Sequence, residues 1–291
     1  MKLKNRISKV FSTRFIIVVI LISGLFYSCN PEKKLAKQFV YQTGKKYALL
    51  FTPDYLIKIN QKTWLLDSID STLSDYEKDS ILWEKSDFVK NIDDSIFLIK
   101  FTRGYAYRLA EYGFDVYGRD YSSEFFNKDS NAYVINIPQI ELEETVYPFK
   151  DETILNGYTY FHQHYLNALS MSTWFEINKV NDTTSQEEVM FAGDIMTDDL
   201  ESNFKYDEVS EKLKYFYKID TLTVNQVYDI AITLGKRYAS YTYDYLLNKY
   251  ILKAEPQKDS LDLYWHYDLE YNKLYPVWKL EDEERLIPVD N

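Results

Sequence analysis

The chain has 291 residues and a formal net charge of −11, from 45 acidic and 34 basic residues. A surface this acidic repels polyanions, so we expect no nucleic-acid partner. Hydrophobic residues make up 46% of the chain, against eight glycines and seven prolines, and this composition excludes a disordered or collagen-like protein.

The first 28 residues have the order of parts that is typical of a secretory signal. Five basic residues and no acidic residue precede an apolar run over residues 15–22. A bilayer core needs roughly 20 apolar residues in a helix, and this run approaches that length only by including Ser23 and Gly24. We therefore interpret residues 1–28 as a signal peptide that is removed, not as a permanent membrane span.

The signal ends in Phe26-Tyr27-Ser28-Cys29, and Cys29 is the only cysteine of the chain. These residues resemble a bacterial lipobox, although Phe26 and Tyr27 stand where Leu and a small residue are commonest. The resemblance implies cleavage before Cys29 and acylation of its sulfur, which would anchor the chain in a membrane. Two alternatives stay open: an uncleaved anchor, and an ordinary signal peptide with a chance cysteine.

The residues after Cys29 are similar to the start of uncharacterised lipoproteins of the Bacteroidota. In that phylum a cluster of acids after the cysteine usually marks export to the cell surface. Here a single acid, Glu32, is followed by Lys33 and Lys34. The resemblance therefore implies the outer membrane, with the body of the protein facing the periplasm.

Removal of residues 1–28 takes away five basic and no acidic residues, which leaves 263 residues with a formal charge of −16. With Cys29 acylated, no disulfide can form, and packing alone must hold the fold. We predict a lipid-anchored α/β half over residues 29–150 and an α+β half over residues 151–291. The boundary near Asp151 is soft, and one continuous domain is the alternative.

Apolar runs and helical patterns alternate in the first half. The expected elements are a helix over residues 32–42, a buried strand over 46–52, helices over 65–91, a buried strand over 95–101, a helix over 104–112 ending at Gly113, and a strand over 114–117. Strand, helix and strand form a βαβ unit, which predicts a largely parallel sheet.

The pattern changes after residue 132. Strands are expected over residues 133–141, 143–149, 174–180, 188–192, 212–218 and 261–269, with antiparallel pairing of the third and fourth. The longest helix is predicted over residues 223–254 from its apolar stripe. The predicted fold class is α/β: a mixed sheet with flanking helices, parallel in the first half and antiparallel in the second.

A short motif occurs twice in the first half, as Phe51-Thr52-Pro53-Asp54-Tyr55 and as Phe101-Thr102-Arg103-Gly104-Tyr105. Both copies follow a predicted buried strand, so both turns would lie at the carboxyl edge of the sheet, where open α/β sheets bind ligands. The candidate ligand-binding residues there are Thr52, Asp54, Thr102 and Arg103. The simpler interpretation is that the threonines cap the following segments and that Asp54 pairs with Arg103.

The sequence lacks the common catalytic and nucleotide-binding motifs G-x-S-x-G, H-E-x-x-H, G-x-x-x-x-G-K and G-x-G-x-x-G. His162 and His164 would lie on one face of a strand and could bind a metal, with His266, Asp262 or Asp268 as a third ligand if the strands are neighbours. Histidines on an exposed strand without a metal are the simpler interpretation. We favour it and expect no cofactor.

Aromatic residues are abundant, with 28 tyrosines, 17 phenylalanines and 5 tryptophans. Such a surplus serves either as a platform for sugar rings or as core and boundary packing, and we favour packing.

Three functions are consistent with the sequence. The favoured one is a non-catalytic, periplasm-facing lipoprotein that binds an envelope protein or helps to assemble an envelope complex. The alternatives are a surface glycan-binding or uptake accessory lipoprotein, and a metal-assisted hydrolase.

Overall fold

The computed structural model describes residues 31–42, 44–66, 72–128, 131–180, 188–254, 261, 263–277 and 285–289. The signal segment and Cys29 lie outside these residues. Contacts divide the chain into two compact units. The small unit comprises Met1–Thr43 and Asp244–Lys279, and the large unit comprises Gly44–Tyr243 and Leu280–Asn291.

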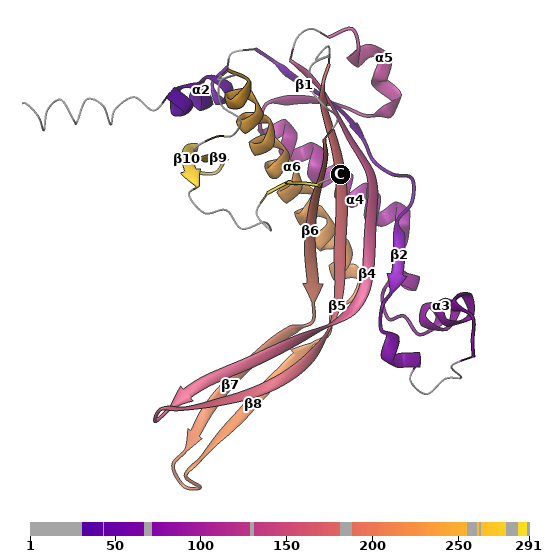
Figure 1. The fold of residues 1–291 in the computed structure, drawn as a ribbon, viewed down its shortest axis with the longest axis vertical. Helices are drawn as coiled ribbons and strands as arrows, with labels where there is room; N and C mark the ends of the chain where they lie inside the picture. Colours follow the sequence, from indigo (N-terminus) through magenta and orange to yellow (C-terminus); the bar gives the residue numbers. More distant parts are fainter. Residues whose placement is uncertain are drawn as a thin grey trace, which may run out of the picture. The chain divides into compact units, whose positions relative to one another are not determined.

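A mixed seven-stranded sheet forms the centre of the large unit (Figure 1). Its strands are ordered β11-β6-β5-β4-β1-β3, and β2 also pairs with β4. The strands β3, β1, β4 and β2 pair in parallel, whereas β4, β5, β6 and β11 pair antiparallel. This arrangement confirms the predicted α/β class. The strands are β1 (Lys46–Phe51), β2 (Ile57–Asn60), β3 (Phe114–Tyr117), β4 (Ala132–Leu155), β5 (Tyr158–Lys179), β6 (Val189–Thr197) and β11 (Ile287–Pro288).

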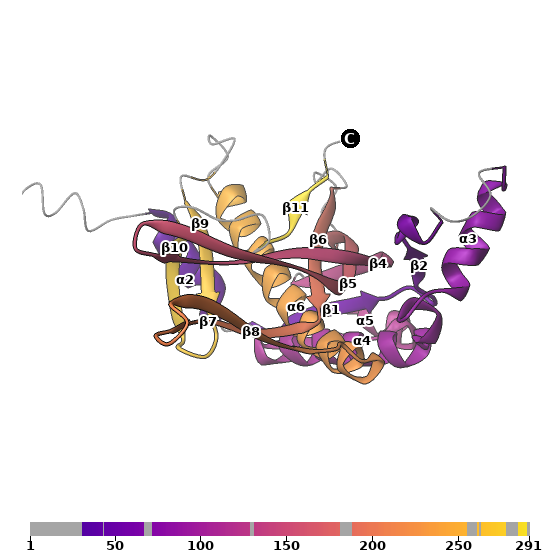
Figure 2. The same ribbon diagram turned by 90° about the horizontal axis from the view of Figure 1, so that it is seen from below.

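Two helices cover one face of this sheet (Figure 2): α4 (Asp94–Glu111) and the large-unit part of α6 (Val224–Ala254). Their shared core is aromatic. The ring of Phe175 on β5 lies 6.3 Å from that of Tyr105 on α4 and 5.8 Å from that of Tyr238 on α6. All three side chains are buried, so the aromatic surplus is used here for packing, as expected.

Glycines set the distance between α4 and α6. A Cβ atom at Gly104 would lie 2.2 Å from the carbonyl oxygen of Ile232, and a Cβ atom at Gly235 would lie 2.2 Å from that of Phe101. No side chain fits at such a distance, because the neighbouring atoms belong to the backbone of the opposite helix. The two helices therefore pack backbone against backbone where they cross.

The strand that we predicted over residues 95–101 is wrong, because these residues begin helix α4. The side chain of Asp93 caps this helix by accepting a hydrogen bond of 3.0 Å from the backbone N–H of Ile96. The helix continues through Gly104, and Gly113 takes the left-handed conformation predicted after its end, with a φ of 84°. The connection from β1 to its parallel neighbour β3 thus contains one long helix.

The region predicted as helices over residues 65–91 is helical in pieces. These are the 3-10 helices η1 (Thr63–Leu66) and η2 (Val89–Asn91) and the α-helix α3 (Asp75–Glu84). Helix α3 begins with a reciprocal capping box between Ser74 and Glu77. Two short helices, η3 (Arg119–Tyr121) and α5 (Ser122–Phe125), follow β3.

The longest strands form one hairpin. Asn156 and Gly157, with φ values of 52° and 80°, make the two-residue turn between β4 and β5. The two strands predicted over residues 133–141 and 143–149 are a single strand, β4, with an irregular register between Asn136 and Gln139. Asp151, where we expected a soft boundary, lies inside this strand. A second hairpin pairs β7 (Asp199–Asp207) with β8 (Lys212–Asp220).

The small unit is built from α2 (Pro31–Val40), the end of α6, and the hairpin of β9 (Tyr264–Asp268) and β10 (Lys273–Val277). Trp265 lies at its centre with 1% of its surface exposed. Its indole N–H donates to Glu32 (3.2 Å), and its backbone exchanges two hydrogen bonds of 2.8 Å with the Asn248 side chain. The helix predicted over residues 32–42 is confirmed as α2, and that over 223–254 as α6.

Candidate functional site

The four residues of the repeated motif do not form a common site. Thr52 and Asp54 follow β1 as predicted, but Thr102 and Arg103 lie inside helix α4. Asp54 pairs with Arg119 (3.3 Å) on the surface, not with Arg103. A pocket of about 230 Å³ beside Asp54 is lined by residues 53–55, 57 and 138–140, without Thr102 or Arg103. The predicted cleft depended on the strand that proved to be a helix.

His162 and His164 lie on one face of β5, as predicted, with ring centroids 5.8 Å apart. Tyr215 on β8 contacts both histidine rings. Its ring stacks on His162 at 4.3 Å, and its hydroxyl lies 2.8 Å from His164 Nε2. His266 belongs to the small unit, and no three His, Cys, Asp or Glu side chains of the described residues gather as metal ligands. The predicted trio is therefore not assembled as a metal site.

His266 is held by a buried acid. Its Nδ1 lies 2.5 Å from Asp244 Oδ2, while Asp244 Oδ1 accepts a hydrogen bond from the backbone N–H of Tyr267 (3.1 Å). Burial raises the pKa of the Asp244 carboxyl. Because both oxygens bind the β9 strand, this pair fastens α6 to β9 in the small unit, and we assign it a structural role.

The ends of two hairpins in the large unit lie side by side and extend beyond the helix-covered part of the sheet (Figure 1). We call residues 147–165 and 199–220 the double hairpin. Tyr215 joins its two layers through the histidines, and Ser202 donates a hydrogen bond of 2.5 Å to Asp151. Side-chain contacts between two thin layers, not a deep core, thus hold the double hairpin together.

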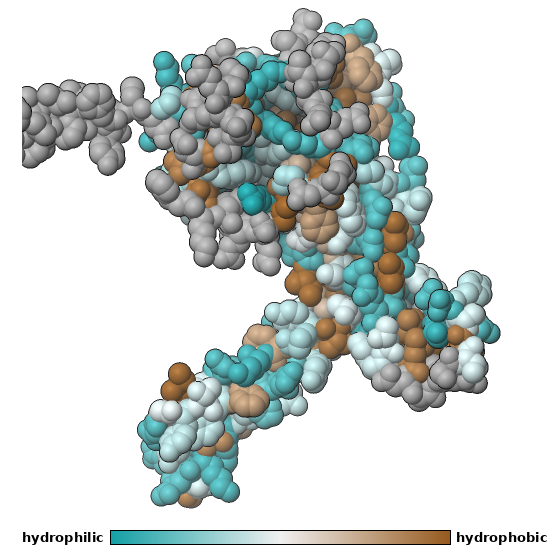
Figure 3. All heavy atoms as spheres, viewed as in Figure 1, coloured by the Kyte–Doolittle hydropathy of each residue, from teal (hydrophilic) through white to brown (hydrophobic). Residues whose placement is uncertain are grey.

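Large apolar and aromatic side chains remain exposed on the double hairpin. They include Ile154, Tyr158, Phe161, Tyr165, Tyr206, Val209, Phe216 and Tyr217, with 46% to 96% of their surface exposed. On the face in view, Figure 3 shows apolar patches separated by polar residues in this region. Aromatic residues in such a polar setting are typical of protein-binding surfaces.

The double hairpin also has open strand edges. Pairing with β2 ends at residue 144 of β4, and pairing with β6 begins at residue 168 of β5. Between these points, among the residues that the structure describes, β4 and β5 pair only with each other, and β7 and β8 do the same. Unpaired edge N–H and C=O groups can accept a strand from another chain.

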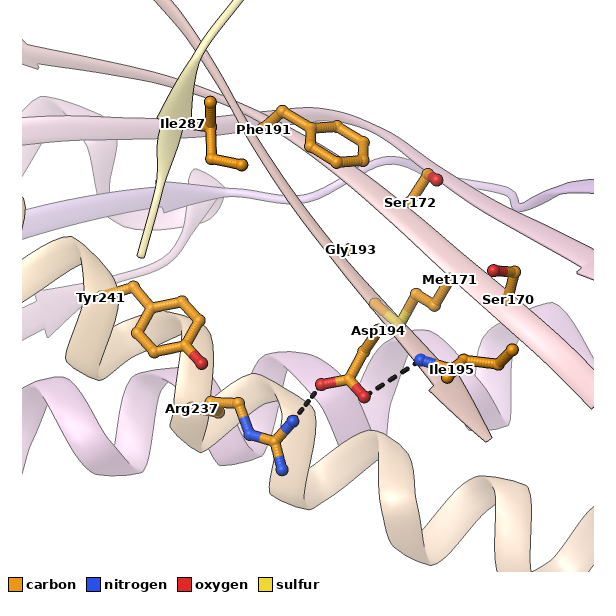
Figure 4. A pocket seen from close by; sticks show the side chains of 10 residues that line it. All are labelled: Ser170, Met171, Ser172, Phe191, Gly193, Asp194, Ile195, Arg237, Tyr241 and Ile287. Atoms are coloured by element: carbon orange, nitrogen blue, oxygen red, sulfur yellow. Dashed lines mark hydrogen bonds and ion pairs between the residues drawn. The ribbon is translucent and has the colours of Figure 1, made fainter. Parts of the chain in front are cut away.

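A pocket of about 650 Å³ lies at the other edge of the sheet, between β5, β6, β11 and α6 (Figure 4). Arg237 of α6 forms an ion pair with Asp194 of β6 inside it. Hydroxyl groups of Ser170, Ser172 and Tyr241 and the ring of Phe191 also line the pocket. Because the two charges neutralise each other, the lining favours a neutral, polar ligand over an ion.

A buried polar junction ties β4 to the segment around η2. The Glu144 carboxylate, with no exposed surface, lies 2.8 Å from Lys62 Nζ and accepts hydrogen bonds from Ser86 Oγ (2.6 Å) and the backbone N–H groups of Asp87, Phe88 and Val89 (2.9, 2.9 and 3.2 Å). Lys62 also donates to Asn167 (3.1 Å), which in turn bonds Asp198. These groups satisfy one another, so we interpret the junction as structural.

No protein-family model matches the chain, and no curated protein is similar to it. No helix within the described ranges is long and apolar enough to cross a membrane. The functional interpretation therefore depends on the surfaces and sequence features of this chain.

Proposed function

We propose that the chain is a lipid-anchored outer-membrane protein, facing the periplasm, that works without catalysis by binding another envelope protein through the double hairpin. The lipid anchor is inferred from the sequence around Cys29. The observation that carries the binding role is the combination of exposed aromatic side chains and open strand edges on the double hairpin.

Exposed aromatic side chains and open strand edges promote unwanted association with other chains unless a partner covers them. Proteins protect exposed strand edges because these invite pairing with other chains. The double hairpin carries Phe161 at 60% and Tyr165 at 70% exposure on one strand, and Phe216 at 50% on another. A partner strand laid along one of these edges would gain main-chain hydrogen bonds from the edge and specificity from the rings.

Site-specific photo-crosslinking in cells tests this role. A photoreactive phenylalanine analogue replaces Phe161 or Phe216 in the double hairpin. Matched controls place it at Tyr76 on α3 and Tyr107 on α4, which are 83% and 54% exposed. We expect both hairpin positions to capture the same envelope protein and the control positions to capture none. Capture at background level from all four positions would contradict the proposal.

A variant with Phe161→Ser and Phe216→Ser should co-purify at least about ten-fold less of the captured partner, because truncation of aromatic side chains in an interface causes the largest losses of binding free energy. The variant with Tyr76→Ser and Tyr107→Ser is its control, and circular dichroism verifies that both variants fold.

The edge pocket supports a second candidate function, glycan binding. Three hydroxyl groups, a neutralised ion pair and the Phe191 ring line a volume in the range of small-ligand sites, and an aromatic face with nearby hydroxyl groups suits a sugar ring. Calorimetric titration of the purified protein with a panel of neutral oligosaccharides tests it. We expect binding that Tyr241→Phe and Ser172→Ala together weaken; no heat signal from any sugar at millimolar concentration would rule this function out.

A further inference from the structure

The described part of the small unit begins almost directly after the predicted lipid anchor. Helix α2 starts at Pro31, and only Asn30 separates that residue from Cys29. A chain advances at most about 3.6 Å per residue, so the Cα atoms of Cys29 and Pro31 lie within about 7 Å of each other. An acyl chain on Cys29 would therefore hold the start of α2 at the membrane surface, with no linker between them.

Charge is distributed very unequally between the two units. From Cys29 onward, the small unit contains eight basic and seven acidic residues, a formal charge of +1. The large unit contains 21 basic and 38 acidic residues, a formal charge of −17. An anionic lipid surface would repel the large unit, so any attraction to that surface has to come from the small unit.

Helix α2 presents its basic residues to solvent. Glu32, Ala36 and Phe39 are buried, and the Phe39 ring packs at 5.4 Å against that of Tyr250 within the same unit. The three lysines of the helix, Lys33, Lys34 and Lys37, are all exposed. The apolar face of α2 is thus already used for folding, and the face left for the membrane is basic.

We propose that the exposed lysine face of α2 lies against anionic phospholipid headgroups. This inference rests on the proposed lipid anchor, which supplies the proximity. Each lysine near an anionic bilayer increases the affinity for the membrane roughly five-fold. The three lysines together therefore favour this orientation of α2, but they do not replace the acyl chain as the anchor. The attraction is screened over roughly 10 Å at 0.1 M salt.

The test couples the lipid chemically. Cys29 is the only cysteine, so a purified chain of residues 29–291 can be joined to a maleimide phospholipid in vesicles, whether or not cells acylate it. Vesicles contain phosphatidylcholine alone or phosphatidylcholine with phosphatidylglycerol. Lysine acetylation is read residue by residue by mass spectrometry, and amide hydrogen exchange is read over α2.

We expect acetylation of Lys33, Lys34 and Lys37 to slow by about five-fold or more on the phosphatidylglycerol vesicles, and to recover in 0.5 M salt. The exposed hairpin lysines Lys205, Lys212 and Lys218 are internal controls and should be labelled equally on both vesicles. Equal labelling of the α2 lysines on both vesicles would overturn the proposal.

Paired variants check that the lysine charges cause the protection. Lys34→Glu with Lys37→Glu should abolish the slowing of α2 amide exchange on anionic vesicles. Lys205→Glu with Lys212→Glu changes the net charge equally and should leave it intact. Protection of α2 on coupled vesicles, together with an unacylated Cys29 in cells, would support the lysine face of α2 as a membrane surface and contradict the proposed lipid anchor. An acylated Cys29 in cells, together with unprotected α2 on coupled vesicles, would support the anchor and contradict the membrane surface.

Discussion

Lys62 and Glu144 form an ion pair that has little contact with water. The side chain of Lys62 is 4% exposed and that of Glu144 is 0% exposed, with 2.8 Å between the charged atoms. Lys62 also contacts Asp87 at 2.8 Å, but the Asp87 side chain is 63% exposed. The two carboxylates bind the same ammonium group at the same distance, but Glu144 is buried and also accepts hydrogen bonds from Ser86 and three backbone N–H groups.

This difference predicts unequal effects of two matched substitutions. Glu144→Gln leaves the Lys62 charge buried with one partner fewer, and breaking a buried pair in this way costs about 3 to 5 kcal/mol. Asp87→Asn removes an exposed partner and should cost less than about 1 kcal/mol. Urea unfolding followed by tryptophan fluorescence measures both; equal losses of unfolding free energy would contradict the structural role assigned to the Glu144 junction.

The same junction predicts how stability depends on pH. Burial alone would raise the pKa of the Glu144 carboxyl, but hydrogen bonds from Lys62, Ser86 and backbone N–H groups outweigh burial and lower the pKa below its usual 4.5. A carboxyl with a lowered pKa contributes stability above its unfolded value and loses that contribution as the pH falls through the folded one.

The difference in unfolding free energy between the wild type and Glu144→Gln should therefore be constant near neutral pH and shrink below about pH 4.5. Urea titrations at several pH values from neutral to acidic measure it. A difference that stays the same down to the acid limit of folding would refute the assignment of this carboxylate as ionised and paired.

Helix α4 shows why an element can be mistaken from sequence. The run Ile96-Phe97-Leu98-Ile99 reads as a buried strand, and Gly104 reads as the end of a turn. Yet Phe97, Phe101, Tyr105 and Leu109 are spaced by four and are all buried, and Asp93 supplies an N-cap. This helical period was present in the sequence. It was obscured because Gly104 serves helix packing, not chain reversal.

The crossing of α4 and α6 gives a prediction at this scale. Gly104→Ala or Gly235→Ala should destabilise the protein by about 1 to 3 kcal/mol or more, because a methyl group would push two backbones apart. Gly118→Ala is the matched control, since no atom lies within 4 Å of its added Cβ and its φ is −89°. Thermal unfolding compares the three, and a neutral result at both helical glycines would contradict the close crossing.

At the scale of the whole molecule, features that depend on one segment of the chain were predicted better from the sequence than contacts between distant segments. The class of the fold, β1 and helix α6 followed from local periodicity, and the antiparallel pairing of β5 with β6 followed from the short connection between the two strands. Strand β7 was missed because its side chains alternate only between half-buried and exposed positions, so no apolar face marks it.

The candidate site was predicted only in part, for a similar reason. The shared face of His162 and His164 followed from their spacing, but their partner Tyr215 comes from another hairpin about 50 residues later, and no local pattern links the two. The Asp194 and Arg237 pair in the edge pocket likewise joins a strand to a distant helix.

The placement of the whole molecule in the cell depends on one sulfur atom. The most direct measurement is the mass of the N-terminal peptide of the protein extracted from membranes of cells that produce the full chain, with Cys29→Ser as the control. We predict that the wild-type protein begins at Cys29 with added glyceryl and acyl groups, and that the Cys29→Ser protein leaves the membrane fraction. A mature terminus elsewhere, or an unmodified Cys29 in membrane-bound protein, would contradict it.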